Sequence, residues 1–208
     1  LNKYEECFFK EYLKKNLNKK VSSHYEKIIE FEHGLRFSEK VKEYKNIDAI
    51  SLVVNFIDIL GHSFTNSKIV KEIIPNEMYY RKEVKNWFEN SWLYETLLEF
   101  KKENRKIIIT SDHGTTIIKK PVIIKADKNT SSGLRYKKGK NLYVGRKDGL
   151  LIKDPLKFRL PKKYDNDNYI IAKKDRFFVY PNDYNHYKNL YLNSFQHGGL
   201  SIEEIFIP

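Results

Sequence analysis

The residues best suited to chemistry lie at 110–114 (TSDHG), directly after the apolar β-branched run 107–109 (III). Such a run predicts a buried strand. In open α/β sheets, ligands bind at the carboxyl ends of the strands. We therefore expect Asp112 and His113 to lie at such an end, where a carboxylate oxygen and an imidazole nitrogen can bind one divalent cation. Gly114 would let the backbone pass close by.

Two further segments carry the same residue types. Residues 50–57 (ISLVVNFI) predict a second buried strand, which ends at Asp58, and His62 follows four residues later. Near the C-terminus, His197 is followed by two glycines. One alternative makes Asp58 a helix cap, and His62 and His197 hydrogen-bonded polar residues of the fold. We favour a metal site, because core packing does not explain two strands with the same ending and a third histidine beside glycines.

These side chains fit a site for two metal ions. Asp58, His62 and His197 could bind one ion, while Asp112 and His113 could supply half of the ligands for another. Mixed carboxylate and imidazole ligands suit Zn²⁺ or Mn²⁺ better than Ca²⁺, which prefers oxygen alone. Two metals about 4 Å apart stabilise the attacking and leaving oxygens of an in-line phosphoryl displacement. A phosphate ester is then the expected substrate.

The length and composition indicate a globular chain. At 208 residues, 40% of them hydrophobic, the chain can form one sizeable domain, or one domain with an insertion. No apolar run reaches about 18 residues and no signal-peptide pattern opens the chain, so no membrane span is expected. Cys7 is the only cysteine, so no internal disulfide can form. This composition fits a reducing cytoplasm.

The charge balance is strongly basic. Lysine and arginine number 39 against 27 acidic residues, a net charge of +12, which favours a polyanionic partner such as nucleic acid, a nucleotide or anionic lipid. The alternative is coding bias, because the chain is also rich in Asn, Ile and Tyr. One stretch is more concentrated, with only Asp127 opposing its positive charges. Its members are Lys125, Lys128, Arg135, Lys137, Lys138, Lys140, Arg146 and Lys147.

Helical and strand patterns alternate in the first half of the chain, which predicts an α/β sheet with a parallel component. The expected elements are an amphipathic helix over 3–19, a helix over 37–45, a strand over 49–57, a polar loop over 61–68, a helical stretch over 76–102 and a strand over 106–110. The helical stretch should break near Asn90 and Ser91, which can cap a second helix. Its aromatic residues at helical spacing are expected in the core.

The second half has shorter elements. We expect a strand over 122–124, a strand pair over 169–172 and 176–180, a short helix near 201–204 and a strand over 205–207. The region that begins at residue 126, rich in Lys, Gly, Asn and Asp, is expected to form a lid or insertion beside the site.

Six ordered blocks of the chain resemble the PglZ domains of the alkaline phosphatase superfamily, in the branch of PorX-type two-component response regulators. The blocks are 55–62 (NFIDILGH), 80–92 (YRKEVKNWFENSW), 110–115 (TSDHGT), 134–141 (LRYKKGKN), 177–187 (FFVYPNDYNHY) and 195–208 (FQHGGLSIEEIFIP). The resemblance implies an alkaline-phosphatase-like α/β sheet flanked by helices. It also implies that the chain is the C-terminal part of such a domain. Its parts would be a leading helical segment (1–45), a strand-helix-strand metal-site core (46–125), a lid or insertion (126–195) and a closing metal loop and strand (196–208).

The resemblance also implies residue roles. Asp58, His62 and His197 would bind the first of two zinc ions, and Asp112 and His113 would bind the second; manganese is an alternative. From their own chemistry, Arg135 could bind a phosphate bidentately, with Lys137 in the same block, or these residues form a basic surface loop. His186 has two neighbours, Tyr184 and Tyr187, that could stack a base, but a packed aromatic turn is the favoured alternative.

The chain departs from the family pattern at its start. Members of the superfamily also use an early Asp and a Thr or Ser nucleophile, and residues 1–45 show no strand that ends in Asp before a nucleophile turn. No catalytic nucleophile is therefore expected within this chain, and we expect it upstream, together with a receiver domain. Thr110 and Ser111 do not lie where the family places its nucleophile.

The expected function is a metal-dependent phosphodiesterase or phosphatase domain of a response regulator, acting on oligonucleotides or cyclic nucleotides. The alternative is a catalytically silent module that binds metal and nucleotide and acts on a transcription or secretion partner. A third is nonspecific nucleic-acid binding by a basic surface, which would need no metal and would weaken steeply with salt.

Overall fold

The computed structural model describes residues 2–17, 20–126 and 130–207. The chain forms two compact units, one made of residues 1–60 and 73–108, the other of residues 61–72 and 109–208. The class is mixed α/β, as predicted, and the strands in the described residues form four small sheets. Among the described helices, none has both the length and the apolar character that a membrane crossing requires.

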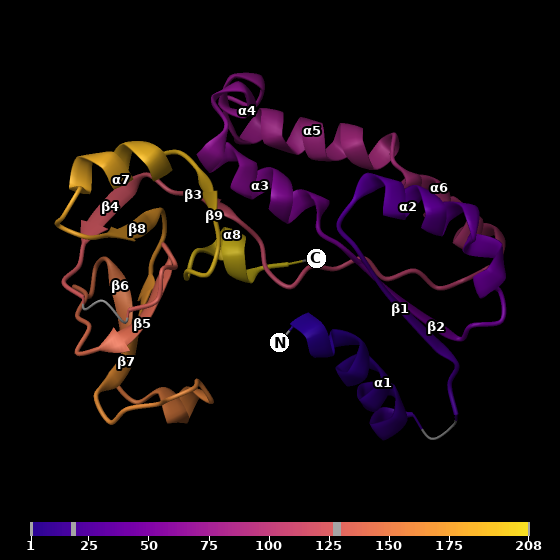
Figure 1. Ribbon diagram of the computed structural model, residues 1–208, viewed down its shortest axis with the longest axis horizontal. Helices are drawn as coiled ribbons and strands as arrows, with labels where there is room; N and C mark the ends of the chain where they lie inside the picture. Colours follow the sequence, from indigo (N-terminus) through magenta and orange to yellow (C-terminus); the bar gives the residue numbers. More distant parts are fainter. Residues whose placement is uncertain (1, 18–19, 127–129, 208) are drawn as a thin grey trace. The chain divides into compact units, whose positions relative to one another are not determined.

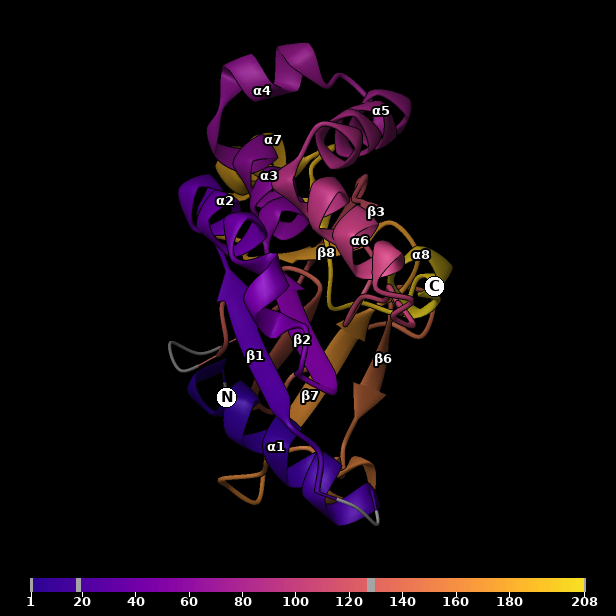
Figure 2. The ribbon, with the colours of Figure 1, turned by 90° about the vertical axis from the view of Figure 1, so that its right-hand side faces the viewer.

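The first unit is built on two parallel strands, β1 (Ser23–Ile28) and β2 (Ala49–Val54), paired in register from Ser23 opposite Ala49. They lie side by side in both views of the ribbon (Figures 1 and 2). Successive residues of β1 contact helices on opposite faces. The Tyr25 hydroxyl donates a hydrogen bond to Glu5 of helix α1 (Glu5–Asn16), whereas Glu26 contacts His33 of helix α2 (Phe31–Glu39). This alternation follows from the two-residue period of a strand.

The core of the first unit lies where β1 meets α2 and α6 (Trp92–Lys102). Its buried side chains are Ile28, Phe37, Val41, Trp92 and Phe100. Gly34 lets α2 approach the Trp92 ring, because a Cβ at this position would lie 2.0 Å from the ring. A short 3₁₀ helix, η2 (Val41–Tyr44), leads toward β2. Helix α1 buries no residue, and both Phe8 and Tyr12 are exposed.

The predicted break in the long helical stretch is confirmed. Helix α5 (Glu77–Glu89) ends before Asn90, and Ser91 is the residue that precedes α6. Asn76 caps the start of α5, where its side-chain oxygen accepts a hydrogen bond from the Tyr79 N–H at 3.3 Å. The Trp87 ring of α5 stacks on Phe56 at 4.1 Å. Of the aromatic stripe, Trp92 is buried as expected, whereas Trp87 and Phe88 are half-buried.

Two predictions around Asp58 are wrong. Strand β2 ends at Val54, and Asp58 lies in the first turn of helix α3 (Phe56–Asn66). The predicted polar loop over 61–68 is mostly this helix, followed by helix α4 (Lys68–Ile73). After Val54, apolar residues recur at helical spacing, at Phe56, Ile57, Ile59 and Leu60. This spacing favours a helix in the segment where the strand was expected to end.

The second unit holds three small sheets. Strands β3 (Thr116–Ile117) and β9 (Phe195–Gln196) are antiparallel, and β4 (Lys120–Ile123) pairs with β8 (Arg176–Val179) in parallel. The third sheet has the order β5-β7-β6, all antiparallel, with β5 at Tyr136–Lys140, β7 at Asp167–Ala172 and β6 at Gly149–Ile152. The other described elements are 3₁₀ helix η3 (Pro155–Phe158) and helices α7 (Tyr184–Tyr191) and α8 (Ile202–Ile205).

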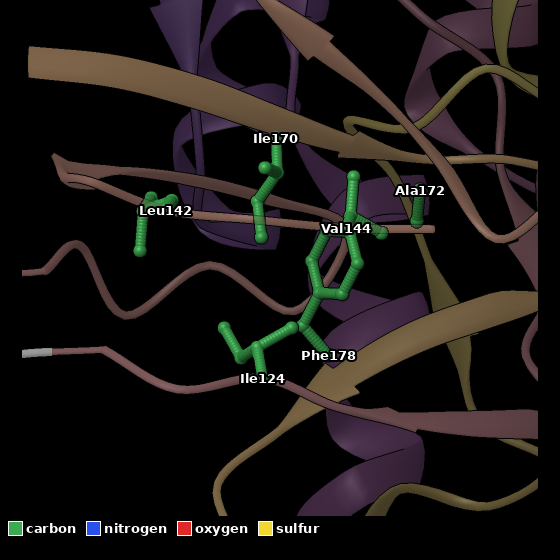
Figure 3. Close-up of a cluster of buried hydrophobic side chains, with 6 residues drawn as sticks. All are labelled: Ile124, Leu142, Val144, Ile170, Ala172 and Phe178. Carbon is green, nitrogen blue, oxygen red and sulfur yellow. The ribbon is translucent and has the colours of Figure 1, made fainter. Parts of the chain in front are cut away.

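Two buried clusters hold these sheets together. The larger consists of Ile124, Leu142, Val144, Ile170, Ala172 and Phe178, shown in Figure 3. The smaller contains Ile118, Phe177 and Val179, with aromatic residues of α7 packed against it. Adjacent residues Phe177 and Phe178 of β8 therefore enter different clusters, as expected for a strand covered on both faces.

Three further strand predictions differ from the structure. Residues 107–109 form no strand, and Ile108 and Ile109 are 77% and 64% exposed. A β-branched run becomes a strand only when a neighbouring strand pairs with it, and none of the described strands does. The segments 169–172 and 176–180 overlap β7 and β8, but these pair with other strands instead of each other. Residues 206 and 207 after α8 are not a strand, and the helix predicted over 37–45 is α2 followed by η2.

Candidate metal centre

The β3–β9 ladder brings two of the predicted ligands together. Thr116 lies opposite Gln196, so the chain just before β3 runs beside the chain just after β9. The His113 and His197 rings stack at 3.9 Å between centroids, with an interplanar angle of 13°. The sequence predicted these residues as ligands of two different ions in a two-ion site, and the second unit places their rings in contact.

Helix α3 supplies a third imidazole to this cluster. The ring of His62 lies 5.5 Å from the His197 ring and meets it edge-on at 74°. Residues from Gly61 onward in α3 belong to the same unit as His113 and His197. We call His62, His113 and His197 the histidine cluster. Three neighbouring imidazoles, with His197 in contact with each of the other two rings, are a donor set typical of zinc sites, because neutral imidazole is a common zinc ligand.

Asp58 lies one turn before His62 on α3, and residues four apart on a helix share a face. The Asp58 carboxylate also affects Tyr80 of α5. Burial, together with the negative charge of Asp58, raises the pKa of Tyr80 to about 12. The Tyr80 hydroxyl donates a hydrogen bond to the Ile57 carbonyl at 3.2 Å. Tyr80 therefore stays neutral, as a hydroxyl close to a carboxylate.

The His113 ring is oriented by its own loop. Its Nδ1 lies 3.1 Å from the Gly114 carbonyl, so Nδ1 carries the proton and donates. This leaves the Nε2 lone pair as the ligand atom, in the way that metal-binding histidines are held by backbone carbonyls. Asp112 accepts a hydrogen bond from the His113 N–H at 3.0 Å, while its side chain is 87% exposed.

Glycines allow both histidine loops to pass close to other backbone. The Gly114 N–H donates to the Glu204 carbonyl at 3.0 Å, and a Cβ on Gly114 would lie 1.9 Å from the Glu203 carbonyl oxygen. Gly198 has φ +94°, a left-handed conformation that favours glycine. The glycine beside each histidine is therefore required by the backbone, as the sequence suggested for both positions.

Two predicted phosphate-binding residues have a different environment. Arg135 is fully buried, and its Nε and Nη2 donate to the two carboxylate oxygens of Glu204 at 2.8 and 2.5 Å. Its Nη1 donates to the Arg176 carbonyl. Lys137 is 2% exposed, and its Nζ lies 4.5 Å from the Tyr180 ring centroid. The prediction that Arg135 and Lys137 contact phosphate directly is therefore wrong, because neither charged group is presented to solvent.

The other residues of the basic stretch differ in their exposure to solvent. Lys125, Arg146 and Lys147 are exposed, while Lys128 lies outside the described residues. His186 is exposed on α7, with its ring 5.3 Å from the Tyr187 ring at 73°. Its proposed contact with a base stays a prediction.

Sequence reasoning missed Glu204, which is buried at 4% exposure beneath the loop of His197. Burial alone would raise the pKa of Glu204, but hydrogen bonds from Arg135 and from the Ser201 and Gly199 N–H groups outweigh it and lower the pKa. A signal was present: Ser201 followed three residues later by Glu204 is a capping-box pattern, in which the Glu side chain bonds back to the N-cap N–H. Here the Ser201 N–H donates to Glu204 at 2.9 Å.

Residues 5–208 match the family model described as PglZ, the BREX system PglZ alkaline phosphatase-like domain. No curated protein matches the sequence. Since the match extends over nearly the whole chain, the chain belongs to the PglZ family of alkaline phosphatase-like domains.

Proposed function

We propose that this chain is the metal-binding part of a phosphoesterase, with Asp58 and the histidine cluster as ligands of divalent cations. The observation that carries the proposal is the stacking of His113 on His197 within an alkaline phosphatase-like domain. Helix α3 supports it, because Asp58 lies one turn before His62 and shares a face of the helix with it. One carboxylate oxygen and two imidazole nitrogens suit Zn²⁺ or Mn²⁺.

The residues of the chain have separate roles in this proposal. The sequence assigned His113 and His197 to different ions, but because their rings stack, we propose instead that both bind one ion, with Asp58 as a third ligand. His62 and the exposed Asp112 would complete the ligands of a two-ion centre. Bound divalent cations would polarise the phosphoryl group and stabilise the leaving oxygen. The Gly114 carbonyl would keep the proton of His113 on Nδ1, which leaves the Nε2 lone pair available to an ion. We propose that the attacking hydroxyl comes from a segment upstream of this chain.

The substrate class follows from phosphate chemistry and charge. The net charge of +12 and the exposed Lys125, Arg146 and Lys147 would attract a polyanionic phosphodiester such as an oligonucleotide or a cyclic nucleotide. The resemblance to PorX-type response regulators supports a receiver domain upstream and a transcription or secretion partner. Sequencing of the segment that precedes this chain tests that context directly.

Metal binding is the first test. Purified protein should contain about stoichiometric zinc or manganese by elemental analysis, and EDTA should remove it. His197→Ala and His113→Ala should each lower the metal content strongly, whereas the matched control His186→Ala, an exposed histidine of the same unit, should not. Absence of bound divalent metal after incubation with excess Zn²⁺ and Mn²⁺ would refute the metal centre.

Catalysis is tested separately, in the whole protein that carries this chain. We expect metal-dependent hydrolysis of bis-p-nitrophenyl phosphate and short oligonucleotides, lost in the presence of EDTA and in His197→Ala. Burial of Arg135 and Lys137 favours a second candidate, a regulatory module that binds metal and nucleotide without cleavage. Metal-dependent oligonucleotide binding without hydrolysis would select that candidate.

A further inference from the structure

Glu204 connects both loops of the histidine cluster. Its carboxylate accepts hydrogen bonds from the Gly199 N–H at 2.8 Å and the Ser201 N–H at 2.9 Å, in the loop that carries His197. Its backbone carbonyl accepts from the Gly114 N–H at 3.0 Å, next to His113. One buried residue thus fixes the backbone on either side of the stacked pair.

Arg135 holds this glutamate in place. Its guanidinium donates to both carboxylate oxygens, an arrangement that fixes direction as well as distance. Arg135 is itself tied to the sheet, because its carbonyl accepts from the Ala172 N–H of β7 at 2.7 Å and its Nη1 donates to the Arg176 carbonyl of β8. The loop lies flat on the guanidinium, since a Cβ on Gly199 would lie 2.3 Å from Nη2.

A buried ion pair is a poor way to gain stability, because desolvation of both charges offsets most of their attraction and apolar residues of similar volume often do as well. What an apolar pair cannot supply here is the set of directed acceptors for the Gly199 and Ser201 N–H groups. The two side chains are 0% and 2% exposed, so water does not compete for the hydrogen bonds between them.

We propose that Arg135 and Glu204 are positioning residues for the metal centre: they hold the loops of His113 and His197 so that the two imidazoles face one cation. This inference rests on the metal centre proposed above and adds two residues that touch neither metal nor substrate. Outer residues that orient metal ligands commonly change metal affinity by about 10- to 100-fold when they are removed.

The experiment separates positioning from stability. The double variant Arg135→Met with Glu204→Leu removes both charges and should keep the fold, while the matched control Arg176→Met with Asp148→Leu removes another ion pair of the same unit, paired at 2.7 Å. Zn²⁺ affinity is measured by chelator competition, and the visible spectrum of the Co²⁺-substituted protein reports the ligand geometry. We expect affinity to fall about 10- to 100-fold, with a changed Co²⁺ spectrum, in the Arg135/Glu204 variant alone.

A second measurement does not depend on metal. In the metal-free protein, proton NMR contacts between the His113 and His197 rings should be present in the wild type and weakened in Glu204→Gln, which keeps the size of the side chain. Unchanged ring contacts in a folded Glu204→Gln protein, or wild-type Zn²⁺ affinity and Co²⁺ spectrum in the folded double variant, would overturn the positioning role. A wild-type protein that binds no metal would instead refute the metal centre, and the ring contacts would still decide whether Glu204 positions the histidines.

Discussion

Lys137 is a charged residue in a place that disfavours its charge. It is 2% exposed, its Nζ faces the Tyr180 ring at 4.5 Å, and burial lowers its pKa from 10.5 to about 8. At about 1.4 kcal/mol for each pH unit between those two values, protonation of the buried amine costs about 3 kcal/mol. Cation–π attraction to Tyr180 offsets about 2 kcal/mol of this at a desolvated site. We therefore expect Lys137→Met to raise the free energy of unfolding by about 1 to 3 kcal/mol at pH 7.

The lowered pKa of Lys137 also predicts how the stability difference between Lys137→Met and the wild type changes with pH. Because the folded pKa lies below the unfolded pKa, the unfolded state binds more protons between pH 8 and 10.5, and wild-type stability gains with rising pH over that window. The free-energy cost of keeping a protonated amine buried at Lys137 is fully present below pH 8 and disappears above pH 10.5. The difference between Lys137→Met and the wild type should thus be largest at pH 7 and shrink by pH 10.

Urea unfolding followed by fluorescence at pH 7, 8.5 and 10 measures this difference. Lys138→Met, the next residue on β5 and only half-buried, serves as the control and should change stability by less than about 0.5 kcal/mol. A Lys137→Met protein that is less stable than the wild type at pH 7, or a difference that does not change between pH 7 and 10, would refute the reasoning.

Three other predictions concern single positions. Gly114→Ala places a Cβ 1.9 Å from the Glu203 carbonyl oxygen, so it should destabilise the chain by about 1–3 kcal/mol and weaken metal binding, as measured by urea unfolding and chelator competition. The pKa of Glu204 is lowered, so its contribution to stability is present above its ordinary pKa of 4.5 and is lost as the pH falls below it. The stability gap between the wild type and Glu204→Gln should therefore narrow in acid, and a gap that is constant from pH 7 to 3 would contradict this. Asn76→Ala removes the cap that accepts from Tyr79 and should cost about 1 kcal/mol in thermal or urea unfolding, whereas Asn76→Asp should cost less.

Local signals in the sequence predicted part of the fold. The helix break at Asn90 and Ser91, strand β4 and helix α8 were all visible because capping residues and apolar spacing act within a few residues. Strand β1 was missed, since its sequence SHYEKI is mostly polar and charged and has a single aliphatic residue. Those charges are satisfied across the fold: Glu26 contacts His24 and His33, and Lys27 pairs with Glu5. A charged strand can be covered on both faces only when such partners exist, and the strand's own sequence does not show them.

The opposite error occurred at residues 107–109. Three β-branched residues in a row predict a buried strand, yet the exposure of Ile108 and Ile109 shows that propensity alone does not make one. Strand formation needs a paired neighbour, and that neighbour is a property of the tertiary fold. His113 still lies beside His197, because the β3–β9 ladder brings the two residues together, and not the strand that was expected to carry His113. Their role as metal ligands stays a prediction.

Arg135 shows why chemistry is harder to predict than position. In sequence it lies in a basic block, where a guanidinium is most easily interpreted as a phosphate ligand. Its actual partner, Glu204, is 69 residues away and beside a histidine loop. The glycine next to each histidine was the better guide, since Gly114 and Gly198 both allow a close or left-handed backbone that a larger residue would strain. A glycine after a candidate ligand indicates that another part of the chain packs closely against it, and that part can hold the ligand in place. At Gly114 the closely packed part is the backbone of Glu203 and Glu204.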